Sequence, residues 1–281
     1  MHQAEQAAAS AMTGREHGHY TTHVSGRAAR VVRLQDYFAL QLHFADVVAA
    51  KAALPLTEVV EQYTNFYWRF GFGIWSDNTP RVPEWDHYKA HLQTLATHDQ
   101  RLTWTQTFYA QLPPERLPAG RQQFGCFGCD PPDADGRVRI HFTNHDTDGT
   151  SPLSRAKIGA RRQDLHALFT YVQQTHAEAA HSVLGGSWLY HFEAYRRLFP
   201  PVYGASRVVQ EGNAHLQGQT CWGQFLDHRE AIRPGLREQL FANLAKVDIP
   251  RLWEAFPVPT YTVQAPIQAF YDLYQVGAQS Y

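Results

Sequence analysis

Side chains able to exchange a proton gather around a segment of alternating residues in the middle of the chain. In residues 138–143 apolar and polar side chains alternate, which predicts a strand with one polar side. His141 lies on that polar side, and because an unperturbed imidazole titrates at about pH 6.5, it is a candidate general base. Tyr190, at the end of the next predicted strand, and Tyr195, shortly after it, are candidate general acids.

A helix with a reversed charge pattern is predicted after this strand. Ser151 and Pro152 are typical of a helix start, so the helix is expected to begin near Pro152. Its opening turns carry the cations Arg155, Lys157, Arg161 and Arg162. A helix N-terminus already holds roughly half a positive charge, so these cations require a negative partner. That partner is either a carboxylate of the fold, such as Asp146 or Asp148, or a phosphate of a bound ligand. The backbone expected to bind such a phosphate is that of Gly149, Thr150 and Ser151.

These groups need a sheet and a helix to hold them in place. Apolar residues recur at helical spacing over residues 158–172, which predicts a helix packed on a sheet. Residues 182–190 predict a second strand. A helix of this length returns the chain to a neighbouring parallel position, so residues 187–189 are expected on a strand beside residues 138–143.

The rest of the chain divides at a proline-rich segment. Residues 1–26 lack apolar periodicity and are expected to form a mobile tail. Apolar stripes predict a helical region over residues 27–118. Alternating segments then predict an α/β domain over residues 119–281. The expected fold class is α+β, with a helical N-terminal region followed by a mixed-sheet α/β domain.

The composition limits the classes of function. The 281 residues contain 25 Lys and Arg against 26 Asp and Glu, so no overall field attracts nucleic acid or an anionic membrane. No apolar run approaches the roughly 20 residues of a membrane span, and no apolar signal core is visible at the N-terminus. Three cysteines provide no disulfide framework, which favours a reducing compartment. We expect a cytoplasmic protein that acts on a small-molecule substrate, with the oligomeric state left open.

Four short segments resemble the C-terminal domain of GNAT-like acyltransferases. They are GRQQF at 120–124, IHF at 140–142, GTSPL at 149–153 and SWL at 187–189, and the likeness covers residues 120–227. The resemblance implies a mixed sheet in which an acyl-CoA thioester is bound where adjacent strands separate, with its pyrophosphate at a helix N-terminus. It also implies transfer of the acyl group to a small-molecule amine.

Two other functions fit parts of the sequence. Nitrogen and oxygen ligands for a metal ion follow the two central strands, namely His141, His145, Asp146, Asp148, His191 and Glu193. A metal-dependent enzyme is therefore one alternative. A non-catalytic interaction protein is the other, with the aromatic C-terminal helix as its docking surface.

Overall fold

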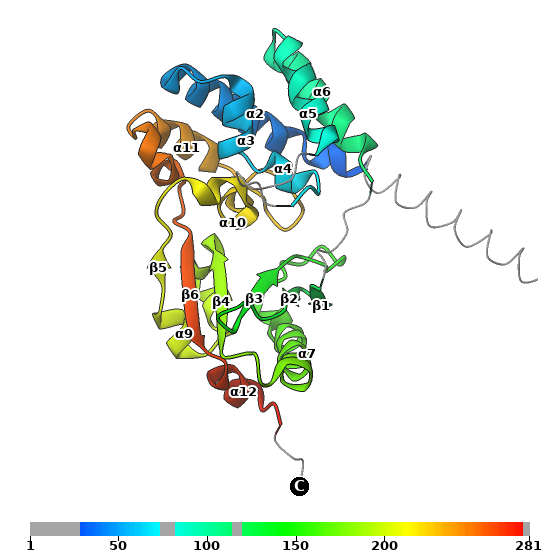
Figure 1. Ribbon diagram of the computed structural model, residues 1–281, viewed down its shortest axis with the longest axis vertical. Coiled ribbons are helices and arrows are strands. Elements are labelled where there is room, and N and C mark those ends of the chain that lie inside the picture. The colour runs from blue at the N-terminus through cyan, green and yellow to red at the C-terminus, as the bar shows by residue number, and fades with distance from the viewer. Residues whose placement is uncertain (1–28, 74–81, 114–119, 278–281) are drawn as a thin grey trace, which may run out of the picture.

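The computed structural model describes residues 29–73, 82–113 and 120–277, and the predicted tail of residues 1–26 lies outside them. The chain forms a helical part at one end and a sheet flanked by helices at the other (Figure 1). The expected helical N-terminal region followed by a mixed-sheet α/β region is confirmed. Within these ranges, no helix is both long enough and apolar enough to cross a membrane.

The helical part begins with helices from the N-terminal half of the chain. They are α2 (Gln35–Ala52), α3 (Leu56–Tyr63), α4 (Phe66–Arg69), α5 (Pro83–Thr94) and α6 (His98–Gln111). The start of α6 is a capping box, in which the Thr97 hydroxyl accepts a hydrogen bond from the Gln100 N–H and the Gln100 side chain accepts one from the Thr97 N–H. The Tyr88 and Thr105 hydroxyls, 2.9 Å apart, join α5 to α6.

The sheet has the strand order β1-β2-β3-β4-β6-β5. Its strands are β1 (Gln122–Phe124), β2 (Phe127–Cys129), β3 (Arg137–Phe142), β4 (Ser182–Ser187), β5 (Val208–Val209) and β6 (Tyr261–Pro266). β3 and β4 are parallel, and the other neighbours are antiparallel. A parallel pair needs a crossover connection, which α7 (Ile158–His176) provides. β3 and β4 are parallel neighbours as predicted, but they pair only through residues 137–139 and 182–184. The expectation that residues 187–189 lie beside β3 is therefore wrong.

The core of the helical part also receives residues from the C-terminal half. Trp222 is fully buried, with its ring centroid 5.2 Å from that of Phe44 and 5.0 Å from that of Phe256. It belongs to a run of short helices, η3 (Ala214–Gln217), α10 (Gln219–Trp222), η4 (Gly223–Phe225), α11 (Leu236–Leu244) and η5 (Ile249–Ala255). This run lies within the range 119–281 assigned to the α/β domain, yet its buried side chains share the core of the N-terminal helices. The chain thus leaves the sheet after β5 and returns to it with β6.

The two faces of the sheet differ in polarity. Val138, Ile140 and Val183 pack in a second core with residues of α7, α8 (Glu193–Arg196), α9 (Pro201–Ala205) and α12 (Gln268–Tyr274). Successive side chains of a strand alternate between faces, so Arg139 and His141 project from the opposite face of β3. The polar face is the one that bears the candidate base.

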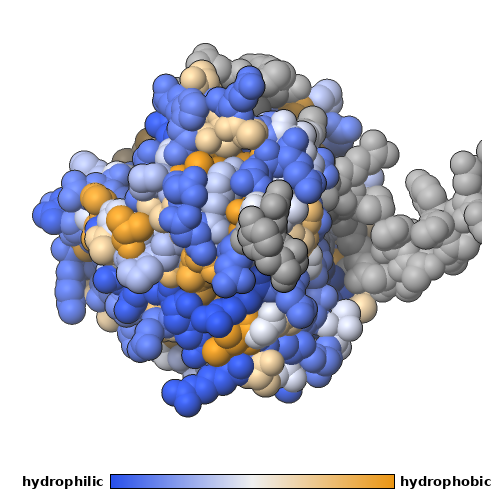
Figure 2. Space-filling model, turned by 90° about the horizontal axis from the view of Figure 1, so that it is seen from below, coloured by the Kyte–Doolittle hydropathy of each residue, from blue (hydrophilic) through white to orange (hydrophobic). Residues whose placement is uncertain are grey.

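The aromatic residues of the C-terminal helix are buried. Phe270, Tyr271 and Tyr274 of α12 belong to the second core, and the ring of Phe270 lies 4.8 Å from that of Phe169 in α7. Seen from below, the molecule is mainly hydrophilic, with hydrophobic residues in separate patches (Figure 2). These aromatic side chains therefore stabilise the core, and a docking surface on α12 would have to use other residues, such as the exposed Leu273.

The second central strand is shorter than predicted. β4 ends at Ser187, and Trp188–His191 form a 3-10 helix, η2, so the expectation that Trp188 and Leu189 lie on the strand is wrong. The serine hydroxyl accounts for the change of direction, because Ser187 Oγ accepts a hydrogen bond from the Leu189 N–H at 3.1 Å.

The crossover helix also starts later than predicted. α7 begins at Ile158 rather than near Pro152, and a 3-10 helix, η1 (Arg155–Lys157), precedes it. A turn closed by the Ser154 N–H and the Ser151 carbonyl, 3.0 Å apart, lies before η1. Pro152 therefore belongs to this turn, and two of the predicted cations lie in η1 rather than in the helix.

Candidate functional site

The parallel strands β3 and β4 separate at their carboxyl ends. They pair over three residues only, and Arg139 opposite Leu184 is the last pair. Beyond it, β3 continues beside β2 to Phe142, and β4 continues beside β6 to Ser187. We call residues 140–142 and 185–187 the strand separation. Ligands of open α/β sheets commonly bind outside the carboxyl ends of the strands, so a binding site is expected at the strand separation.

Buried tyrosines lie next to the strand separation. Tyr190 Oη and Tyr203 Oη are 2.9 Å apart, and a Cβ atom at Gly185 would lie 2.1 Å and 2.3 Å from them. Glycine is needed here because any side chain would overlap both hydroxyl groups. Tyr195 of α8 completes the cluster, with its ring centroid 5.0 Å from that of Tyr190. The fold therefore brings the two candidate acids together and adds Tyr203 to them.

Burial keeps these phenols protonated. Removal from water disfavours a phenolate, so desolvation raises the pKa values of Tyr190, Tyr195 and Tyr203 well above their ordinary value. All three are protonated at neutral pH, and the burial that raises their pKa values also makes them weaker acids than a tyrosine in water.

On the opposite face, His141 belongs to a chain of charged groups. His141 Nε2 lies 2.7 Å from Asp130 Oδ2, and Asp130 Oδ1 accepts a hydrogen bond from Arg121 Nε at 2.6 Å. The strand register explains the contact, because His141 faces Gly128 of β2, which has no side chain, and Asp130 directly follows β2. The carboxylate sets the orientation of the ring and engages Nε2, so proton transfer to a substrate falls to Nδ1.

Burial and charge act in opposite directions on His141. Desolvation lowers its pKa, the hydrogen bond and charge of Asp130 raise it, and the net pKa is lower than that of a free imidazole. The ring is therefore neutral at neutral pH, as a general base must be. Burial tends to raise the pKa of Asp130, but the hydrogen bonds from His141 and Arg121 prevail and hold that pKa well below its usual range.

Carboxylates of the fold neutralise two of the four cations near the start of α7. Lys157 Nζ lies 2.5 Å from Asp148 Oδ2 and 3.3 Å from Asp146 Oδ2. Arg161, with a side chain only 5% exposed, pairs with Asp146 at 3.2 Å and with Asp164 at 3.1 Å. A buried guanidinium held by two carboxylates is part of the structure, and its removal would leave them unpaired.

Arg155 and Arg162 differ from these two cations. Both are exposed, and neither forms an ion pair with a carboxylate in the described part of the chain. Among the same residues, the buried atoms Ser154 Oγ and Arg197 Nε have no hydrogen-bond partner. Arg197 lies beside Ser154 because its Nη2 donates to the Leu153 carbonyl at 2.8 Å. The start of α7 therefore presents free positive charge next to unsatisfied polar atoms.

The segment expected to bind an anion is partly engaged by the protein itself. The Thr150 N–H donates to Asp148 Oδ1 at 3.0 Å, and the Gly149 carbonyl accepts a hydrogen bond from His228 Nε2 at 3.0 Å. His228 lies in the loop after η4, so Gly149 is attached to the helical part. Ser151 is half-buried and closes the turn before η1.

The residues considered as metal ligands do not gather at one point. Asp146 and Asp148 are paired with cations, and His141 is paired with Asp130. The remaining candidates are exposed, namely His145, His191 and Glu193. Across the described ranges, no three His, Cys, Asp or Glu side chains are arranged to hold one ion. The carboxylates here neutralise arginine and lysine side chains.

Three residues of the site were not indicated by sequence patterns. Asp130 resembles an ordinary turn residue, Arg121 precedes a short strand, and Tyr203 follows two prolines. Asp130 directly follows β2, and the antiparallel pairing of β2 with β3 places it near His141. No comparable signal exists for Tyr203, whose position depends on how α9 packs against β6.

Comparisons with protein-family models, with curated proteins and with solved structures gave no match to this chain. The chemistry of the site therefore has to follow from its geometry.

Proposed function

We propose that this protein transfers an acyl group from a coenzyme A-type thioester to a small-molecule amine. The observation that carries the proposal is the strand separation, where two parallel strands part beyond Arg139 and Leu184. Strand edges that lack a neighbour can bind an extended chain through main-chain hydrogen bonds, and the pantetheine arm of coenzyme A is such a chain. Strands that separate in a mixed sheet are also what the GNAT-like resemblance of residues 120–227 implies.

The start of α7 suits the phosphate end of this donor. Arg155 and Arg162 supply charge that no described carboxylate neutralises, and Ser154 Oγ and Arg197 Nε supply buried polar atoms without protein partners. The helix N-terminus adds its own partial positive charge. A pyrophosphate group is the kind of anion that such exposed cations bind, so the charges at this end of α7 suit the donor.

The side chain of His141 can move the proton that the reaction transfers. The bound thioester supplies an acyl carbon that accepts the electron pair of the amine nitrogen, while the carbon–sulfur bond breaks and its electron pair leaves on sulfur. Nδ1 of the neutral His141 ring takes the proton that the amine loses, and Asp130 holds the ring in place. The same proton then passes from the His141 imidazolium to the departing sulfur, so the ring returns to its neutral state and the thiol leaves.

Calorimetry with coenzyme A and acetyl-CoA tests the proposal. Arg155→Glu combined with Arg162→Glu is expected to weaken binding by about tenfold or more, because two cations become anions beside phosphate groups. The loss should be larger at low salt, where such charges are screened less. Arg237→Glu combined with Lys246→Glu is the matched control, since it makes the same change in net charge at exposed positions of the helical part.

Two results would contradict the proposal. One is that the wild type binds neither coenzyme A nor acetyl-CoA. The other is that both double variants lose the same affinity, because the effect would then come from net charge rather than from the start of α7.

A further inference from the structure

Arg139 differs from the arginine next to it on the polar face of β3. Arg137 pairs with Asp133 at 2.9 Å and with Asp135 at 2.8 Å. Arg139 is exposed, and its guanidinium has neither a hydrogen bond nor an ion pair with any residue that the structure describes. Two arginines on one strand face thus have opposite states, one neutralised and one free.

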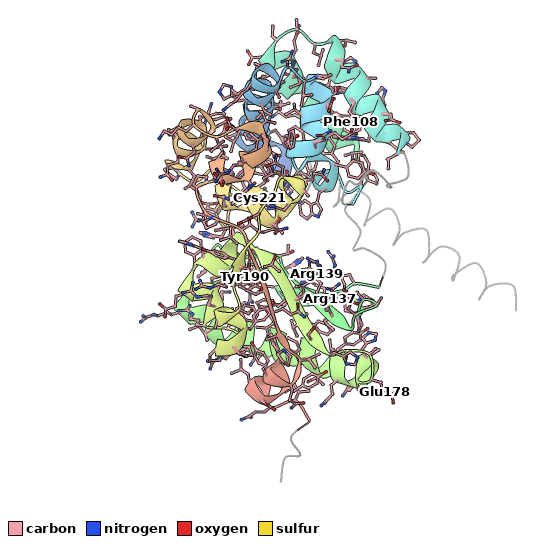
Figure 3. The ribbon with its side chains drawn as sticks, turned by 60° about the vertical axis from the view of Figure 1, so that its left-hand side comes forward. Phe108, Arg137, Arg139, Glu178, Tyr190 and Cys221 are labelled. Carbon is pink, nitrogen blue, oxygen red and sulfur yellow. The ribbon has the colours of Figure 1, made fainter. Side chains whose placement is uncertain are left out.

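The free guanidinium lies at the strand separation. Arg139 Nη1 is 3.8 Å from the position that a Cβ atom of Gly186 would take, and Thr220 Cγ2 is 4.0 Å from the same point. Because Thr220 belongs to α10, the guanidinium lies where β4 meets the helical part. Figure 3 shows Arg139 between Arg137 and the part of the molecule that contains Cys221.

Further positive charge lies along this junction. Arg233 Cζ is 4.9 Å from the ring centroid of Trp188, which immediately follows β4. Arg69 is 3% exposed, and its Nη2 donates to Gln219 of α10 at 3.0 Å. Arg69 has no salt bridge within the described residues, and its Cζ lies 5.3 Å from the ring centroid of Tyr37. Burial lowers the pKa of Arg233, and the charge of Asp227 only partly offsets that effect. Positive charge removed from water without a carboxylate favours an anion in the vicinity.

The spacing of Arg139 and His141 defines what the anion can be. The two residues are two positions apart on one face of β3, which is about 7 Å along a strand. A guanidinium binds a carboxylate through two parallel hydrogen bonds. The imidazole turns toward Asp130 beside β2 and the guanidinium toward Gly186 of β4, so the two end groups lie on opposite sides of β3. A short molecule can lie across the strand between them. Such a molecule carries a carboxylate at one end and an amine a few bonds away.

We infer that the acceptor is a free amino acid, whose carboxylate is bound by Arg139 and whose amine lies beside His141. This inference rests on the proposed acyl transfer and specifies its second substrate. The amine loses one proton to His141 and forms the new bond to the acyl carbon, while coenzyme A leaves as the thiol. The product is an N-acyl amino acid.

Paired acceptors test the inference by kinetics. Initial rates are measured with acetyl-CoA and with glycine, alanine, leucine and glutamate, each against its own α-amide. We expect kcat/KM for the best acid to exceed that of its amide at least tenfold in the wild type. The ratio should fall to about one in Arg139→Gln and should be unchanged in Arg137→Gln, the ion-paired control on the same face. The amine of the amide is less basic, so near neutral pH a larger fraction of it is unprotonated. Amine reactivity alone would therefore favour the amide and cannot produce a preference for the acid.

A binding measurement separates this inference from the choice of donor. The same acids and amides are titrated into the full chain by calorimetry without coenzyme A. At least one acid should bind the wild type more tightly than its amide, and Arg139→Gln should weaken it tenfold or more. If an acid binds more tightly than its amide and depends on Arg139 while coenzyme A does not bind, the result supports the carboxylate site and contradicts the proposed donor. The inference is overturned if amides bind or react as well as acids, or if Arg139→Gln preserves the preference.

Discussion

Substitution of Gly185 by alanine should destabilise the protein, although it adds a single methyl group. The new Cβ atom would lie 2.1 Å from Tyr190 Oη and 2.3 Å from Tyr203 Oη, where ordinary contact begins at 3.4 Å. One hydroxyl would therefore have to retreat by about 1.3 Å, the difference between 3.4 and 2.1 Å. Both rings are fully buried and pack against Tyr195 and Phe199, so little room exists for that movement.

The expected loss is about 2–3 kcal/mol in the free energy of unfolding. Overpacking of a core costs about 1–3 kcal/mol, and the clash with two hydroxyls places this case near the upper end. Gly186→Ala is the matched control, because its Cβ atom would meet nothing closer than 3.8 Å. It should be neutral or stabilising by up to about 1 kcal/mol, since alanine restricts the unfolded chain. Urea unfolding measures both, and equal stabilities of the two variants would refute the reasoning.

Stability measurements also test the role of Arg161 and of one buried histidine. Arg161→Met should cost about 2 kcal/mol or more, because Asp146 and Asp164 lose their shared cation, whereas Arg162→Met should change the stability by less than about 0.5 kcal/mol. Similar losses in the two variants would contradict the buried ion pairs. Burial lowers the pKa of His215 to about 4, so the unfolded chain binds more protons than the folded chain between about pH 4 and 6.5. The neutral form of His215 makes its whole contribution to the free energy of unfolding above about pH 6.5. That contribution should decline by on the order of 2 kcal/mol as the pH falls to 4. His215→Gln should remove that part of the pH dependence, and an unchanged profile would show that His215 is not buried in its neutral form.

Periodicity predicts the long elements of this fold better than their limits or their partners. The alternation around Val138 and the helical spacing over residues 158–172 both correspond to observed elements. The predicted start of α7 near Pro152 is too early, because Ser151 and Pro152 suit a tight turn as well as a helix start. In the run 214–255, leucines four residues apart indicate α11, whereas the other helices are too short to show a period. Its place in the helical part depends on contacts such as those of Trp222 with Phe44 and Phe256, which are remote in sequence.

The candidate site could be predicted by residue type but not by environment. His141 is recognisable as a histidine on the polar side of a strand, whereas its pairing with Asp130 depends on strand register. Tyr190 and Tyr195 were identified as proton donors, but only packing shows that both are wholly buried. Helical spacing places Arg161 nearer than Arg162 to the apolar stripe of α7, but the carboxylates that neutralise it are known only from the fold.

The cations left without carboxylates define where two anionic substrates can meet. The reversed charge pattern at the start of α7 is resolved for Lys157 and Arg161 by carboxylates of the fold, and only Arg155 and Arg162 remain for a ligand there. Arg139 is the corresponding free cation on the sheet, beside the last residue pair before the strands part. A donor with phosphates at α7 and an acceptor with a carboxylate on Arg139 would therefore approach the strand separation from different elements. Because the two sets of cations belong to different elements, substitutions at α7 should change the affinity for the donor alone, and substitution of Arg139 should change the affinity for the acceptor alone.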